Sequence, residues 1–244
     1  MNILLFGAEA GDIEKYAARF RALKVVESDP EVVVCYGGDG TLLAAELKWP
    51  GIPKVPIRNS RRGQRCIPHP PDRVLERLAK NDLVRCEYAK LECALCRPSD
   101  ASSVCCLTAM NEVNVHMGHI NVAVRFNLWI DDEPYDAGKE IVGDGFVVCT
   151  PFGSTAYFNQ ITRGLFYRGL GVAFKYTAEH TNHLVLPEDA VIRARMTRGP
   201  AVLAYDNAPE YLQVSAGDEL IIRRHDAPAV LLTWQAMSHP SDEF

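Results

Sequence analysis

The sequence predicts two domains: an N-terminal α/β domain with a Rossmann-like parallel sheet, and an all-β C-terminal domain. In roughly the first eighty residues, short apolar runs alternate with segments whose apolar residues recur at helical spacing. From about Leu83 onward, many apolar residues recur at every second position, which is typical of strands. The chain has 244 residues, 48% of them hydrophobic and 23% charged, so it can form two folded domains and is not globally disordered.

The N-terminal part is expected to alternate strands and helices. Three apolar runs are predicted as strands, at 3–6, 32–36 and 55–57. The second is a continuous β-branched run, as expected for a strand that is covered on both faces. Three helices are predicted as well: one capped by Asp12, one opening at Thr41 and one following Pro70 and Pro71. This order favours parallel strands with helices packed beside them.

The C-terminal part reads as a series of short strands with little helix between them. Strands are predicted at 91–96, 104–107, 113–116, 121–131, 146–149, 191–196, 202–205 and 220–224. Such a series favours an antiparallel β domain. We place the boundary at the connector Asn81–Asp82, which gives domains 1–81 and 82–225. The C-terminal segment 226–244 could join the first of them.

Charge and composition exclude several classes of protein. There are 26 Lys and Arg residues and 31 Asp and Glu residues, for a net charge of −5, which argues against nucleic-acid and anionic-membrane partners. No apolar run approaches the ~18 residues of a spanning helix, and the start has no basic leader, so a cytoplasmic protein is expected. The 8 cysteines lie mainly within apolar runs, which suits buried thiols. Cys93 and Cys96 would face opposite sides of a strand, so no zinc site is expected.

The first chemical signal is the run Gly-Gly-Asp-Gly-Thr at 37–41, between a buried strand and a helix. Its glycines let the backbone approach a ligand closely, and the free N–H groups of a helix start favour an anion such as phosphate. Asp39 would repel phosphate, so it is better suited to holding a metal or taking a proton from an attacking hydroxyl. A plain strand-to-helix turn is the alternative. The run matches neither a P-loop nor a dinucleotide fingerprint.

Two further signals lie in the β-rich part. Asp144-Gly145 is followed by a strand and then by Thr-Pro-Phe-Gly-Ser-Thr-Ala-Tyr at 150–157. This places hydroxyl groups and an aromatic ring close together, which suits a nucleoside. The pair Asn111-Glu112 precedes a strand and could read ribose or amide groups, although a turn pair is the better interpretation of it alone.

Together, the three signals resemble the NAD kinase family, in motif order and approximate spacing, over roughly 32–206. The resemblance implies phosphoryl transfer from ATP or polyphosphate to the adenosine 2′-hydroxyl of NAD, which forms NADP. It also implies Mg²⁺ brought by the donor, small-molecule nucleotides as the ligands, and a homodimer or homotetramer with the active site between the domains.

The resemblance assigns roles to residues that match the family's motifs. Asp39 would activate the hydroxyl, and the phosphates would be held by Gly38, Gly40 and Thr41. Sugar and base would be fixed by Asn111, Glu112 and Asp144, and the NAD pocket would be lined by Thr150, Ser154, Thr155, Ala156 and Tyr157. Three further matches are looser: Asn59, His183 and Asp206.

Departures from the family pattern leave other functions open. Four arginines occupy the loop that follows the third strand: Arg58, Arg61, Arg62 and Arg65. Arg58 and Arg62 are our candidates for phosphate contacts, and a solvated loop is the alternative. Phe152 stands where the family has a second threonine. A nucleotide-binding regulator without catalysis and a kinase for another nucleotide therefore remain alternatives. A lipid kinase is a further, less favoured alternative, because lipid kinases share the Gly-Gly-Asp-Gly run.

Overall fold

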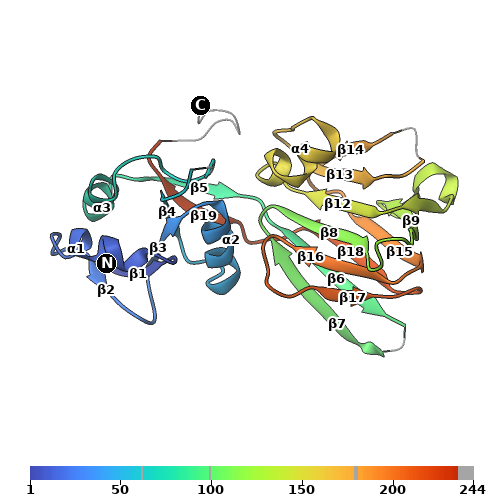
Figure 1. The fold of residues 1–244 in the computed structure, drawn as a ribbon, viewed down its shortest axis with the longest axis horizontal. Helices are drawn as coiled ribbons and strands as arrows, with labels where there is room; N and C mark the ends of the chain where they lie inside the picture. The colour runs from blue at the N-terminus through green and yellow to red at the C-terminus, as the bar shows by residue number, and fades with distance from the viewer. Residues whose placement is uncertain (62, 99, 179–180, 236–244) are drawn as a thin grey trace. The chain divides into compact units, whose positions relative to one another are not determined.

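The computed structural model describes residues 1–61, 63–98, 100–178 and 181–235, and it divides into two compact units (Figure 1). The first unit comprises Met1–Tyr88 and the chain after Asp226, and the second comprises Ala89–Asp226. The division after Tyr88 differs from the predicted boundary at Asn81. The reason is that strand β5 (Val84–Tyr88) pairs with strand β19 (Ala229–Thr233) in the sheet of the first unit.

The first unit has a six-stranded sheet with the order β2-β1-β3-β4-β19-β5. Its other strands are β1 (Asn2–Phe6), β2 (Lys24–Val25), β3 (Val32–Gly37) and β4 (Lys54–Arg58). All neighbours are parallel except β5, which runs antiparallel to β19. The predicted Rossmann-like α/β layer is therefore confirmed.

The helices of the first unit differ in detail from the prediction. They are η1 (Ala10–Ile13), α1 (Glu14–Ala17), α2 (Asp39–Lys48) and α3 (Pro71–Ala79). The helix expected after Asp12 is only a 3-10 turn followed by one α-helical turn, and Asp12 lies inside η1 instead of capping it. Helix α2 begins at Asp39, two residues before the predicted Thr41, because Gly38 occupies the N-cap position.

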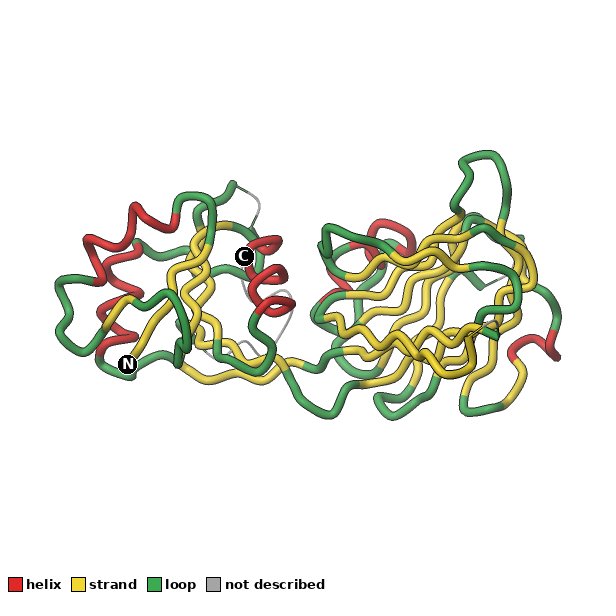
Figure 2. The backbone as a smooth tube through the Cα atoms, turned by 90° about the horizontal axis from the view of Figure 1, so that it is seen from below, coloured by secondary structure: helices red, strands yellow, loops and turns green. Residues whose placement is uncertain are grey.

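The second unit is a β-sandwich, and Figure 2 shows its strands in two layers. One sheet has the order β10-β9-β15-β18-β6-β7 with β11 beside β9, and the other has the order β14-β13-β12-β8-β16-β17. All pairings are antiparallel, as predicted. The strands of the first sheet are β6 (Leu91–Arg97), β7 (Asp100–Ala109), β9 (Val124–Ile130), β10 (Glu133–Pro134), β11 (Ile141–Gly143), β15 (Ile192–Arg198) and β18 (Glu219–Arg224). The strands of the second sheet are β8 (Glu112–Met117), β12 (Gly145–Cys149), β13 (Leu170–Lys175), β14 (His183–Leu186), β16 (Ala201–Tyr205) and β17 (Leu212–Val214).

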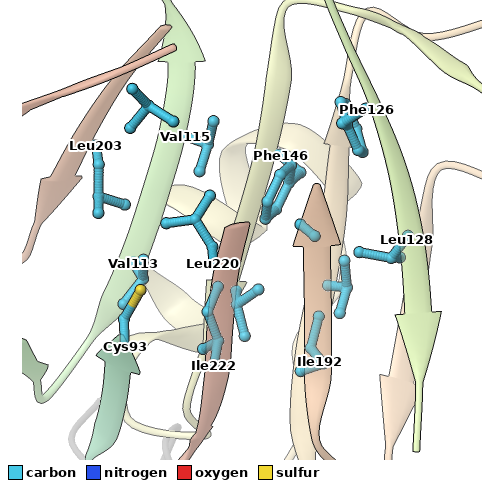
Figure 3. Packing of buried hydrophobic residues seen from close by; sticks show 14 of the residues in the cluster. Cys93, Val113, Val115, Phe126, Leu128, Phe146, Ile192, Leu203, Leu220 and Ile222 are labelled. Atoms are coloured by element: carbon cyan, nitrogen blue, oxygen red, sulfur yellow. The ribbon is translucent and has the colours of Figure 1, made fainter. Parts of the chain in front are cut away.

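A core of apolar side chains fills the space between the two sheets (Figure 3). Phe126 from β9 meets Phe146 from β12, with ring centroids 4.9 Å apart. Cys93 is fully buried in this core, whereas Cys96 alternates to the other face of β6, as the sequence predicts. Within the described ranges, no group of three His, Cys, Asp or Glu residues could hold a metal ion, and no helix is long and apolar enough to cross a membrane.

The outer face of the second sheet is covered at β12 and β13. Both strands are buried along their whole length, whereas burial alternates over the first four residues of β8 and no residue of β14 is fully buried. The cover comes from η3 (Gly153–Thr155) and α4 (Tyr157–Thr162). The other 3-10 helix of this unit, η2 (Tyr135–Gly138), lies elsewhere. Phe158 of α4 packs with Val147 and Cys149 of β12 in a second cluster. The segment that carries the Thr-Pro motif is therefore fixed against the sheet by apolar contacts.

Candidate functional site

The glycine-rich run at 37–41 lies where β3 ends and α2 begins. The neighbouring strands β1 and β4 are parallel to β3, so all three end at the same edge of the sheet, where α/β proteins bind ligands. A Cβ atom on Gly37 would lie 2.2 Å from Oγ1 of Thr41, so glycine is required for this close turn. The N-terminus of the ten-residue helix α2 thus opens at a ligand-binding edge, which favours an anion.

Asp39 is held by the loop that follows β4. Its Oδ1 accepts a hydrogen bond from the backbone N–H of Arg65 at 2.9 Å, and its Oδ2 accepts one from that of Gln64 at 3.0 Å. Sγ of Cys66 lies 3.6 Å from Oδ1. The side chain is only partly exposed. A carboxylate fixed by two backbone donors is oriented and can still accept a proton from a hydroxyl group.

The other predicted residues of the first unit lie in the same loop region. The backbone N–H of Asn59 donates to the carbonyl of Gly37 at 2.7 Å, and the Asn59 amide donates to Glu9. Nη1 of Arg58 lies 3.4 Å from the carbonyl oxygen of Gly63, and the Arg58 side chain is exposed. The structure therefore brings Arg58 and Asn59 to the glycine-rich run. Arg62 lies outside the described residues.

In the second unit, Asp206 organises the pair Asn111-Glu112. Its carboxylate accepts hydrogen bonds from the backbone N–H groups of Met110 at 2.7 Å, Asn111 at 2.7 Å and Glu112 at 3.2 Å. Asp206 follows β16, which pairs with β8, so the pairing of these strands brings the two segments together. Asp206 is thus a positioning residue for the start of β8.

Asn111 and Glu112 each present a buried polar atom that has no partner among the described residues. These atoms are Oδ1 of Asn111 and Oε2 of Glu112. Leaving a buried polar atom unpaired costs roughly 1–3 kcal/mol, so such atoms indicate a missing ligand or water. Burial, and then the nearby Asp206 carboxylate, raise the pKa of Glu112 to about 8. Glu112 is therefore mostly protonated at neutral pH and can donate a hydrogen bond.

The Thr-Pro motif forms a tight turn against Asn111. The Thr150 hydroxyl donates to the carbonyl of Met110 at 2.6 Å and accepts from the N–H of Gly153 at 3.2 Å. The Ser154 hydroxyl lies 2.8 Å from the carbonyl of Pro151 and 3.1 Å from that of Phe166. Both side chains are fully buried, so their hydroxyls hold the turn. The next two residues, 155 and 156, are partly exposed, and Tyr157 is exposed.

Asp144 and Tyr157 line a pocket of about 450 Å³ within the second unit. Its other lining residues are His116, Gln160, Ile161, Phe174, Lys175, Tyr176, Thr177 and Asn182. The pKa of Tyr157 is raised by burial and then by the charges of Asp144 and Glu112. The volume falls within the range of small-molecule sites, roughly 300–1,000 Å³.

Sequence reasoning missed Lys175 and His116. Lys175 ends the buried strand β13 and is only 3% exposed, and its Nζ contacts Oδ1 of Asn114 at 2.6 Å and Nδ1 of His116 at 3.1 Å. The available signal was a lysine that closes an apolar run, which is usually read as the exposed end of a strand. His183 lies on β14 against Phe158, with ring centroids 5.5 Å apart, and does not line the pocket.

Comparisons with known proteins identify relatives of this chain. The family model of the ATP-NAD kinase C-terminal domain matches residues 110–233, just over half of the chain. An NAD kinase of Gemmatimonas aurantiaca is 29% identical over 212 residues, which cover 81% of this chain and 70% of the relative.

Two solved structures have a similar fold. Yeast NADH kinase complexed with NADH matches with a TM-score of 0.77 and 18% identity, covering 90% of this chain and 68% of the other. An NAD kinase from Archaeoglobus fulgidus in complex with ATP matches with a TM-score of 0.73 and 19% identity, covering 95% of this chain and 92% of the other.

Proposed function

The chain belongs to the NAD kinase family, and from this premise we propose that it is a phosphotransferase that converts NAD to NADP. It would transfer the terminal phosphoryl group of ATP or polyphosphate to the adenosine 2′-hydroxyl of NAD. One observation carries the proposal: the carboxylate of Asp39 is held by backbone N–H groups beside the N-terminus of α2. This combines a proton acceptor and an anion-binding helix end at one edge of a sheet.

In the proposed reaction, Asp39 takes the proton of the 2′-hydroxyl as the hydroxyl oxygen attacks the terminal phosphorus atom of the donor. The bond between that phosphorus atom and the bridging oxygen of the donor breaks, so ATP leaves as ADP and polyphosphate leaves one unit shorter. The proton then passes from Asp39 to solvent, which restores the carboxylate. Positioning and charge stabilisation, more than covalent chemistry, accelerate this type of transfer.

Phosphate binding is assigned to the first unit. We propose that the phosphates contact the glycine-rich turn and the arginine loop, at Gly38, Gly40, Thr41, Arg58 and Arg62, with Asn59 shaping that loop. Mg²⁺ would enter bound to the phosphate oxygens of the donor and neutralise part of their charge.

NAD recognition is assigned to the second unit. The unpartnered atoms of Asn111 and Glu112 favour contacts with the sugar and base edges, and protonated Glu112 would donate to an acceptor of the nucleoside. Asp144, Thr155, Ala156 and Tyr157 would line the rest of the site. Thr150, Ser154 and Asp206 would support it through the backbone, as their buried hydrogen bonds suggest. His183 would support α4 through Phe158.

The proposal also covers the oligomeric state and the cellular location of the enzyme. We propose a homodimer or homotetramer on the resemblance to the family. We propose the cytoplasm as its location because all eight cysteines are described and none of them forms a disulfide, which suits a reducing compartment.

An end-point assay tests the activity, the donor and the phosphorylated hydroxyl together. Protein, Mg²⁺ and NAD are incubated with ATP or with polyphosphate, and the product is measured with a dehydrogenase that accepts only the 2′-phosphorylated dinucleotide. We expect product with at least one donor. Tight NAD binding without any product would contradict the proposal and favour a nucleotide-binding regulator or a kinase for another nucleotide. Binding to phospholipid vesicles instead would favour a lipid kinase.

A further inference from the structure

We propose that Lys175 is a specificity-determining residue that makes the pocket of the second unit accept an anionic group of the nucleotide. The inference rests on the proposed function, because it takes the ligand to be a nucleotide. The group is a carboxylate or a phosphate, and its acceptor oxygen would lie against the ammonium group of Lys175. The described residues that line the pocket all lie within Ala89–Asp226.

The ammonium group of Lys175 is buried and is held by neutral groups. Its Nζ donates to Oδ1 of Asn114 at 2.6 Å and contacts Nδ1 of His116 at 3.1 Å. Nδ1 of His116 also lies 3.1 Å from the backbone carbonyl oxygen of Asp144, so it either accepts from Lys175 or donates to that carbonyl, according to the tautomer. Asn114 and His116 together take at most two of the three N–H bonds of Lys175, which leaves at least one for a ligand.

Within the described part of the chain, no carboxylate balances this charge by direct contact. Lys175 forms no ion pair there, and Asp144 acts on it only through its longer-range charge. Desolvation lowers the pKa of Lys175 to about 7, although the charge of Asp144 opposes this. A buried cation without an ion-pair partner is costly, and an anion seated beside it would relieve that cost.

The other walls of the pocket suit the rest of a nucleotide. Tyr157 presents its ring with the centroid 5.8 Å from Nζ of Lys175, and Phe174 and Ile161 add apolar surface. Asp144 can accept hydrogen bonds from hydroxyl or amide groups. A planar ring or sugar that has donors toward Asp144 and an anionic group toward Lys175 therefore suits the pocket.

The anion could come from two parts of a dinucleotide, and the substrates distinguish them. NAD carries a neutral carboxamide on its pyridine ring, whereas nicotinic acid adenine dinucleotide carries a carboxylate there. ADP-ribose has the same pyrophosphate without the pyridine ring. A ring carboxylate at Lys175 would favour the acid dinucleotide over NAD, and a pyrophosphate at Lys175 would bind all three ligands through the same contact.

Calorimetric titration of the full chain with these three ligands tests the inference. Lys175→Met should weaken the binding of either the acid dinucleotide alone or all three ligands, by about tenfold or more. Lys175→Arg keeps the positive charge, so it should retain at least part of the wild-type affinity. Lys139→Met is the matched control, because Lys139 is an exposed lysine of the same unit outside the pocket. Its affinities should equal those of the wild type.

Thermal unfolding of each variant is measured in parallel, and a Lys175→Met variant that does not fold is replaced by Lys175→Gln. The inference is wrong if the folded variant binds all three ligands within twofold of the wild type, or if the wild type binds none of them. Because the readout is binding, it is separate from the kinase activity. Binding that weakens in Lys175→Met, without NADP formation by the wild type, would support the inference and contradict the proposed function. NADP formation by the wild type, with binding unchanged in Lys175→Met, would do the reverse.

Discussion

Oδ1 of Asp39 accepts a hydrogen bond from the backbone N–H of Arg65 at 2.9 Å, which ties the start of α2 to the arginine-rich loop after β4. The second oxygen of Asp39 is held in the same way by Gln64. The proposed base therefore also shapes the loop that is proposed to bind phosphate. A substitution at Asp39 must be judged by substrate binding as well as by turnover.

Asp206→Asn should destabilise the protein by about 1–3 kcal/mol, because it replaces the carboxylate that accepts hydrogen bonds from three backbone N–H groups. The amide of asparagine has one acceptor oxygen, so at least one donor at the start of β8 would lose its partner. Chemical denaturation followed by circular dichroism measures the change in the free energy of unfolding. Asp132→Asn, at an exposed aspartate, is the control and should change stability by less than about 0.5 kcal/mol. Equal stability of the two variants would contradict the role of Asp206.

Glu112→Gln should change how stability depends on pH. The pKa of Glu112 is raised from 4.5 to about 8 in the folded protein, so the folded state binds the proton more tightly than the unfolded chain does. The resulting stabilisation is complete below pH 4.5 and is lost as the pH rises through 8.

Glutamine resembles the protonated form, so Glu112→Gln should unfold at a temperature close to that of the wild type at pH 5. At pH 9 it should be the more stable protein, by at most roughly 5 kcal/mol. Differential scanning calorimetry across this range measures the effect, with exposed Glu133→Gln as the control. If the stability of the wild type and that of Glu112→Gln depended on pH in the same way, the pKa of Glu112 would not be raised as expected.

Gly153→Ala should distort the turn that supports Asn111. A Cβ atom at position 153 would lie 2.3 Å from the carbonyl oxygen of Asn111, so the backbone of one segment must move. We expect a loss of about 1–3 kcal/mol in stability and weaker nucleotide binding. In Gly164→Ala, the nearest atom, Oγ1 of Thr162, would lie at 3.5 Å, an ordinary contact. This variant should therefore retain affinity, and a Gly153→Ala variant that does the same would contradict the prediction.

The sequence predicts the architecture well where one element carries a long, consistent pattern. The continuous apolar run of β3 and the alternating runs of β6 and β9 form strands close to the predicted positions. Residues 84–88 fall in the predicted second domain but form β5 of the first sheet, because their partner β19 lies far along the chain and pairing at such a distance leaves no local signal. Asp12 fails as a cap because the turn after β1 closes as a 3-10 helix.

The site could be predicted in part. Motif order identified Asp39 and Asn111-Glu112, which the structure places at a sheet edge and at the start of a strand. It could not show whether the hydroxyls of Thr150 and Ser154 face a ligand or the backbone, because that depends on how the turn packs. Lys175 was missed because a buried lysine depends on partners from other strands, here Asn114 and His116 of β8.

The central claim, that Asp39 takes the proton of the 2′-hydroxyl of NAD, is tested most directly by comparing NADP formation in the wild type and Asp39→Asn. The account predicts that kcat falls by about 10²–10⁴ in the variant while the Kd for NAD stays within a few-fold. Exposed Asp12→Asn is the matched control and should turn over at the wild-type rate. A folded Asp39→Asn variant that forms NADP as fast as the wild type would contradict the account.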